Sequence, residues 1–412
     1  MSKSSHPDDT RAISRSKLVY LYISSVLGVG ILIVPGITVQ YAGGAAIFVW
    51  LALGGLCAAI ATMFAKISTQ FPHASGVRDI IESSLGAFLS QYATIALLVV
   101  YVVGNPAMGI STAQYLQSFV DIDLSYAPLA FGLMVFSIGL TVLPAKILGT
   151  VQVWAMRIAL TAILLAIVIA IPSMEWSNLT SREFTGIRPT LAAAGIAMYA
   201  YLGWENVSLL AGRVKSPEKS FRWAIRWAVP IVASVYLIAA VAFSTLPSGG
   251  GTLLVPALTA DAPAFVRLPI LAASVVALIA ATNAWVLGGV SLFEDRLRAY
   301  NVPGHPGVLA RGILVVGYGA VLLCTHLGIV DLERLLLWTS CLFMTVYALA
   351  AYAVIREEKR ATLSAVVIIA AATVVLISEQ TLGLILLLFT VVAIATTERR
   401  RHVSALRTSH HR

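Results

Sequence analysis

The chain has 412 residues, of which 59% are hydrophobic and 11% are charged, and its mean hydropathy is +0.89. A soluble domain cannot bury that much apolar side-chain surface, so composition excludes this class. Apolar runs of roughly 18 residues or more recur along the chain, and each could cross a hydrocarbon core of about 30 Å. The sequence therefore predicts an all-α integral membrane protein.

Twelve membrane spans are expected in chain order. The last two are short and closely joined, as an addition to a core of ten helices. Because twelve is an even number, both ends of the chain would lie on the same face of the membrane. The expected spans are residues 18–40, 44–65, 88–118, 126–144, 147–171, 190–211, 223–245, 266–292, 309–327, 332–355, 362–378 and 381–396.

The positive charge is concentrated on the face that carries both termini. All but four of the 28 Lys and Arg fall there, and the exceptions are Arg182, Arg188, Arg267 and Arg334. The positive-inside rule therefore predicts cytoplasmic termini in a plasma membrane. The formal charge of +9 is better explained by anionic lipid at this face than by nucleic acid.

Two expected spans are interrupted near their middles. The first contains SSVLGVGILIVPG (residues 24–36), with Gly28 and Gly30 at its centre, and the sixth contains AMYAYLGWENVSLLAG, with Gly203 and Glu205. Five spans separate the two breaks, and an odd number of spans inverts the second copy of a repeat. Paired interruptions in two halves of a chain point to the binding site of a transporter.

A broken helix exposes backbone groups that a continuous helix would use. Free N–H groups at the start of the second half-helix suit a carboxylate, and carbonyls at the end of the first suit an ammonium group. Glycine also allows a close approach by the ligand. A single G-x-G would more simply serve close helix packing, but the paired breaks favour a site for a zwitterion.

Four motifs, in order, resemble those of the amino acid–polyamine–organocation transporters. That family shares the inverted-repeat fold of the bacterial leucine transporter. The resemblance implies twelve helices in a 5+5 inverted repeat with helices 1 and 6 broken. The motifs are LGVGILIVPG (27–36), QFPHASG (70–76), YLGWENVSLLAGRVKSPEKSFRWAI (201–225) and SLFEDRLRAYNVPG (291–304).

The resemblance also implies an organisation of the chain into one membrane domain. A cytoplasmic tail (1–17) precedes the first repeat (18–172), and the second repeat follows at 190–356. Helices 11 and 12 (361–397) and a basic cytoplasmic tail (398–412) complete the chain.

The resemblance assigns backbone contacts to the substrate. Its carboxylate would meet the N–H groups around Val29 and Gly30. Its ammonium group would meet carbonyls near Val26 in span one and near Tyr199 and Leu202 in span six. The family's central Ser of G-S-G is Val29 here, so one hydroxyl contact is lost.

Two side chains match the arginine/agmatine antiporter branch of the family. Asn105 in span three and Trp285 in span eight would line the pocket. Asn105 could instead make an interhelical hydrogen bond beside Pro106, and Trp285 could be an ordinary packed side chain.

Two ionisable residues are candidates for proton coupling. Glu205 lies in the interrupted sixth span, where an ionised carboxylate is costly unless it is paired. It could carry a proton or simply tie span six to span one. Arg157, in span five, could replace a coupling cation or could snorkel toward the cytoplasm.

These observations predict a secondary active transporter of amino acids that works by alternating access. The named pocket residues are mostly apolar, which favours neutral, aliphatic substrates in export or proton-coupled exchange. The alternatives are a cationic arginine/agmatine-type antiporter and a membrane amino acid sensor that has lost transport. No nucleotide-binding, metal-binding or nucleophile–base motif is evident, so no enzyme activity and no cofactor are expected. Bacterial plasma membrane is the expected location, and a homodimer remains open.

Overall fold

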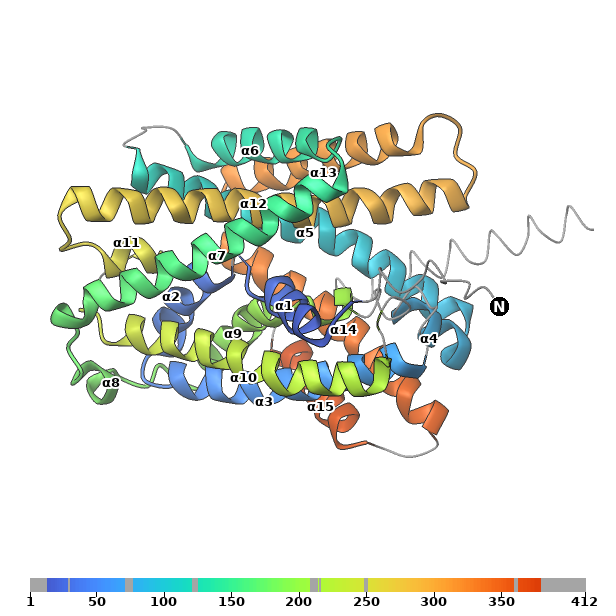
Figure 1. Ribbon diagram of the computed structural model, residues 1–412, viewed down its shortest axis with the longest axis horizontal. Helices are drawn as coiled ribbons and strands as arrows, with labels where there is room; N and C mark the ends of the chain where they lie inside the picture. Colours follow the sequence, from blue (N-terminus) through green and yellow to red (C-terminus); the bar gives the residue numbers. More distant parts are fainter. Residues whose placement is uncertain are drawn as a thin grey trace, which may run out of the picture.

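The computed structural model describes residues 13–28, 30–70, 77–120, 125–207, 214, 216–247, 251–358 and 362–378. This part of the chain is built of helices (Figure 1). The helices before the second break are α1 (Arg15–Val26), α2 (Gly30–Ala42), α3 (Ala46–Gln70), α4 (Val77–Leu85), α5 (Ala87–Phe119), α6 (Tyr126–Leu140), α7 (Ala145–Ala170), η1 (Ile171–Ser173), α8 (Asn178–Ser181), α9 (Ile187–Met198) and η2 (Tyr199–Tyr201). Those after it are α10 (Pro217–Ser244), α11 (Leu254–Leu258), α12 (Ala264–Ala299), α13 (Pro306–His326), α14 (Leu332–Glu358) and α15 (Leu363–Ser378).

Seven helices within the described residues are long and apolar enough to cross a membrane, and the bent pair α1–α2 makes an eighth candidate. The shorter α6 and α15 also contain apolar helical stretches. Eleven of the twelve expected spans overlap helices of the structure. The twelfth, 381–396, lies outside the described residues, as do the basic tail, the motif residues 71–76 and the first twelve residues.

Several helices differ from the expectation in presence or extent, and α4 and α12 are the clearest examples. The amphipathic α4 occupies the connection between the second and third spans, where no helix is predicted. Helix α12 continues past residue 292 to Ala299, beyond its apolar run. In this extension Arg298 pairs with Glu294 one turn earlier, and pairs at this spacing stabilise a helix in water.

The first expected break is present between α1 and α2. Helix α1 ends at Val26, α2 begins at Gly30, and their axes differ by 50°. The second break follows η2, where Leu202 and Gly203 leave the helical conformation. The backbone dihedral φ of Gly203 is +115°, a value that residues other than glycine rarely adopt. The rest of the sixth span, from residue 208, lies outside the described residues.

The broken segments lie in the middle of the bundle. In Figure 1, α5, α6, α12 and α13 lie on one side and α3, α10 and α15 on the other, with α1, α2 and α14 between them. Helix α2 packs against α9, while α10 packs against both α3 and α1. Both breaks are therefore surrounded by protein, which is where non-helical backbone is tolerated at membrane depth.

Candidate functional site

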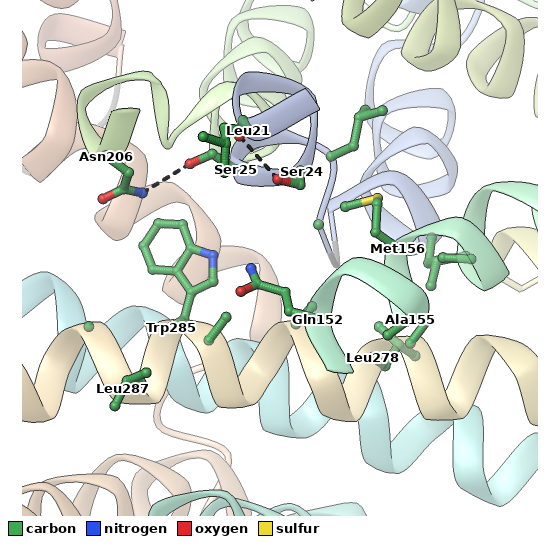
Figure 2. A pocket seen from close by; sticks show the side chains of 18 of the residues that line it. Leu21, Ser24, Ser25, Gln152, Ala155, Met156, Asn206, Leu278, Trp285 and Leu287 are labelled. Atoms are coloured by element: carbon green, nitrogen blue, oxygen red, sulfur yellow. Dashed lines mark hydrogen bonds between the residues drawn. The ribbon is translucent and has the colours of Figure 1, made fainter. Parts of the chain in front are cut away.

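The two broken segments are hydrogen-bonded to each other. The hydroxyl of Ser25, in the last turn of α1, donates to the carbonyl of Gly203 over 2.8 Å. The side-chain amide of Asn206 donates to the Ser25 hydroxyl over 3.3 Å (Figure 2). A Cβ atom at Gly203 would lie 2.5 Å from the carbonyl oxygen of Ser25, so the approach depends on glycine. The breaks form one structural unit.

A tyrosine of α10 also joins the two broken segments. The hydroxyl of Tyr236 lies 2.7 Å from the carbonyl of Ala200 and 3.1 Å from that of Val26. Its ring stacks on Trp50, with 5.2 Å between the ring centroids. Gly30 lies so close that an added Cβ would be 2.9 Å from the Cα of Ala200. The hydroxyl thus bonds one carbonyl from each break.

A cavity of about 280 Å³ lies beside the broken segments (Figure 2). Its polar lining comes from Ser24, Ser25, Gln152 and Asn206, and the rest is apolar or aromatic. Among the described residues that line it, none carries a charged side chain. The described residues that line it are Leu21, Ser24, Ser25, Leu27, Gly28, Leu32, Tyr101, Gln152, Ala155, Met156, Ala159, Asn206, Val207, Ala277, Leu278, Ala281, Ala284, Trp285, Leu287 and Gly288.

Two of the residues expected at the site face this cavity. Gly28 lines it at the first break, and Trp285 lines it from α12. The Trp285 ring is held between Tyr101 and Phe343, with 6.0 Å between its centroid and each of theirs. The aromatic group is therefore packed on two neighbours while part of its surface faces the cavity.

Gly30 and Tyr199 line a separate, narrow crevice between α2, α5, η2 and α14. Two of the three carbonyls expected to bind the ammonium group accept hydrogen bonds within the protein. The Val26 carbonyl accepts from the Tyr236 hydroxyl and the N–H of Gly28, and the Tyr199 carbonyl accepts from the N–H of Leu202. Val29 lies outside the described residues.

Asn105 does not line the cavity. It is buried on α5, and its side-chain amide donates to the hydroxyl of Tyr318 on α13 over 2.6 Å. This contact is the interhelical hydrogen bond that the sequence left open as the alternative. Thr112, two turns further along α5, makes a second polar contact across helices, 3.4 Å from Thr282 of α12.

Glu205 and Arg157 lie in different surroundings. Glu205 is partly buried next to the second break, and the hydroxyl of Tyr347 on α14 donates to its carboxylate. Arg157 is exposed on α7, with its guanidinium 4.9 Å from the ring centroid of Trp154 and 5.6 Å from that of Tyr20. An exposed cation against aromatic rings matches the snorkelling alternative for Arg157.

The sequence did not identify several residues that hold the site together. Ser25 and Asn206 are polar residues beside the two breaks, so their position offered a signal. Tyr236 and Tyr347 lie far from either break in sequence, and tyrosines within apolar runs are common. Their roles depend on how α10 and α14 pack, which no local pattern shows.

Comparison with known proteins identifies the family. The model of the amino acid permease family matches residues 13–405. The chain belongs to this family. The resemblance indicated by the four motifs is thus confirmed, and the protein is a multi-pass membrane protein. Within its described residues, no group of three His, Cys, Asp or Glu could hold a metal ion.

Individual relatives are distant. The chain is 26% identical over 247 residues to the methylthioribose transporter of Bacillus subtilis, covering 55% of this chain and 53% of that protein. It is 25% identical over 230 residues to the serine/threonine exchanger SteT of the same organism, covering 53% and 51%. It is 21% identical over 252 residues to the vacuolar cationic amino acid transporter 8 of Arabidopsis thaliana, a match that covers 57% of this chain and 43% of that protein. The chain thus spans about half the length of these relatives. Their names indicate different substrates.

Proposed function

We propose that this amino acid permease is a secondary active transporter of neutral, aliphatic amino acids. The observation that carries the proposal is the cavity beside the two breaks, whose lining, as far as the structure describes it, has no charged side chain. At about 280 Å³ it is close to the lower end of the range of roughly 300–1,000 Å³ typical of small-molecule sites. An uncharged site of this size favours a small substrate without net charge.

The broken backbone supplies partners for the charged ends of a zwitterion. The first N–H groups of α2, which begins at Gly30, have no partners within that helix and carry the positive end of its dipole. They suit a carboxylate. The carbonyls of Val26 and Ala200 suit an ammonium group once the hydroxyl of Tyr236 releases them. A 5+5 inverted repeat and alternating access at this unit are part of the proposal.

Glu205 is the proposed proton-linked group. It lies one residue from Asn206, which lines the cavity, and its carboxylate is bonded to Tyr347 of α14. Protonation of Glu205 would make its carboxyl group a weaker hydrogen-bond acceptor for Tyr347. The contact between the second break and α14 would then weaken. Exchange against a counter-substrate is the alternative form of coupling. The exposed position of Arg157 makes it the weaker candidate.

A cationic antiporter is the second candidate function. The position of Trp285 in the cavity supports it, and so does the cationic amino acid transporter among the relatives. The uncharged lining and the contact of Asn105 with Tyr318 weigh against it. A transport-inactive sensor is the third candidate.

Transport in proteoliposomes distinguishes these functions. Purified protein would be tested for uptake and efflux of labelled leucine, methionine, arginine and agmatine at two pH values. We expect leucine or methionine to move in a pH-dependent way, and Glu205→Gln to abolish the pH dependence. The matched control is Glu183→Gln, which removes an exposed carboxylate far from the second break in sequence.

Each other outcome selects a different function. Exchange of arginine and agmatine alone would establish the cationic antiporter. Binding of an amino acid without movement of any would establish the sensor. Unchanged pH dependence in Glu205→Gln, with transport intact, would remove Glu205 as the proton-linked group.

A further inference from the structure

A second, larger recess lies away from the candidate transport site, on the surface between α3 and α10. It has a volume of about 820 Å³ and is formed where α3 ends and α10 begins. The positive-inside rule predicts that these helix ends lie at the cytoplasmic face. The residues that line it, which we call the α3–α10 groove, are Thr62, Ala65, Lys66, Thr69, Gln70, Pro217, Glu218, Phe221, Arg222, Ile225 and Arg226.

The α3–α10 groove carries three cations and one carboxylate. Lys66 pairs with Glu358 at the end of α14, and Arg222 pairs with Glu218 over 2.7 Å on the same helix. For Arg226 no carboxylate of the described residues lies within ion-pair distance. Among the described residues the groove thus has an excess of positive charge, and the guanidinium of Arg226 is the one that is not paired with a carboxylate there.

The wall of the groove beside these cations is apolar. Ile225 is partly exposed and lies three residues from Arg222 on α10, a spacing that places both side chains on one side of the helix. Ala65 adds apolar surface from α3. A free phosphate ion would use the cations only, whereas an amphipathic ligand would use both surfaces.

Two tryptophans mark the depth of the groove in the membrane. The side chains of Trp223 and Trp227 are 38% and 52% exposed, and their ring centroids are 6.4 Å apart. Exposed tryptophans in membrane proteins are enriched at the headgroup level of the bilayer. Arg222 and Arg226 alternate with these rings along α10, so their charges lie at the same depth.

We propose that the α3–α10 groove binds an anionic phospholipid. The phosphate would accept hydrogen bonds from the guanidinium groups of Arg226 and Arg222, which match phosphate oxygens in geometry. An acyl chain would lie along the partly exposed side chain of Ile225. Basic recesses between helices at the cytoplasmic face are suited to such headgroups.

Native mass spectrometry of the full-length protein in detergent tests this proposal. Phosphatidylglycerol would be titrated against wild type and Arg226→Ala, with phosphatidylcholine as the zwitterionic lipid that has no net charge. We expect tighter binding of phosphatidylglycerol and an affinity about fivefold lower in Arg226→Ala, since one cation near the surface contributes about 1 kcal/mol. Arg188→Ala, which removes one exposed cation from the start of α9, is the matched control and should bind as wild type does.

Three results would overturn the proposal: equal binding of the two lipids, equal affinity of Arg226→Ala and wild type, or competition by free glycerol phosphate at matched concentration. The last result would assign the groove to a soluble phosphate. Arg226→Lys guards against a folding defect, because it keeps the charge and should retain most of the preference for phosphatidylglycerol.

Discussion

At the scale of single residues, Tyr236 is the contact that most directly couples the two breaks. Its buried hydroxyl lies within hydrogen-bond distance of one carbonyl from each broken segment. Tyr236→Phe would leave both carbonyls without this partner, and an unsatisfied buried polar group costs about 1–3 kcal/mol. We therefore expect a lower midpoint of thermal unfolding in detergent for Tyr236→Phe.

Tyr201→Phe is the matched control for Tyr236→Phe. The two rings are neighbours, with 5.0 Å between their centroids, and both are buried. The Tyr201 hydroxyl has no hydrogen-bond partner among the described residues. Removing it should therefore leave the unfolding midpoint unchanged or raise it. If both substitutions lowered the midpoint equally, loss of the hydrogen bonds to the breaks would not be the cause.

Asn105 gives a second prediction at this scale. Its amide joins α5 to α13 through Tyr318, and such interhelical hydrogen bonds in membranes contribute about 0.6–2 kcal/mol. Asn105→Ala should therefore lower the free energy of unfolding by this amount while leaving the KM for transport unchanged. A double-mutant cycle with Tyr318→Phe measures the coupling between the two side chains. A raised KM with normal stability would instead place Asn105 in the substrate site.

At the scale of elements, the break of the sixth span depends on one glycine. Gly203 has a positive φ, and its α-carbon faces the backbone of Ser25. A residue held at such a φ without being glycine costs on the order of 1–3 kcal/mol. Gly203→Ala should therefore destabilise the protein and reduce transport, measured by thermal unfolding and by uptake in proteoliposomes.

Gly55→Ala tests whether glycine substitution in a helix is harmful in general. Gly55 lies inside α3, and an added Cβ there would meet no atom within 4 Å. Alanine is favoured over glycine within helices by up to about 1 kcal/mol, so this variant should be as stable as wild type or more so. Equal losses in the two variants would contradict a special role for the second break.

The elements also show what the sequence could predict. Apolar runs located the spans, because length and hydropathy alone decide which segments can cross a bilayer. Glycines in the middle of two apolar runs located the breaks, because glycine permits backbone dihedrals that lie outside the helical range. The partners of the breaks could not be predicted: Tyr236 reaches Val26 only through the packing of α10 against α1. For the same reason Asn105 turned out to face α13.

At the scale of the whole molecule, α1, α7 and α12 line the cavity mainly with residues toward one end of each helix. The lining residues of α1 precede the first break. Three of the four from α7 lie in its first half, and four of the seven from α12 lie in its second half. Helices α7 and α12 are spans five and eight of the expected order, so they run in opposite directions. The cavity therefore lies toward the membrane face at which α1 begins, which the distribution of Lys and Arg predicts to be cytoplasmic.

Cysteine labelling tests this placement. Gln152→Cys lines the cavity, whereas Ser111→Cys would lie in the narrow crevice beside Gly30. Both would be made in a background with Cys324→Ser, since Cys57 and Cys341 are buried. A membrane-impermeant maleimide should label Gln152→Cys in inside-out vesicles and not in right-side-out vesicles, and should label the buried Ser111→Cys in neither. Labelling of Gln152→Cys from the outer face alone would reverse the predicted orientation of both termini.

The same cysteine tests which substrate occupies the cavity. Protection of Gln152→Cys from labelling by leucine, and not by arginine, would show that the cavity binds the neutral substrate.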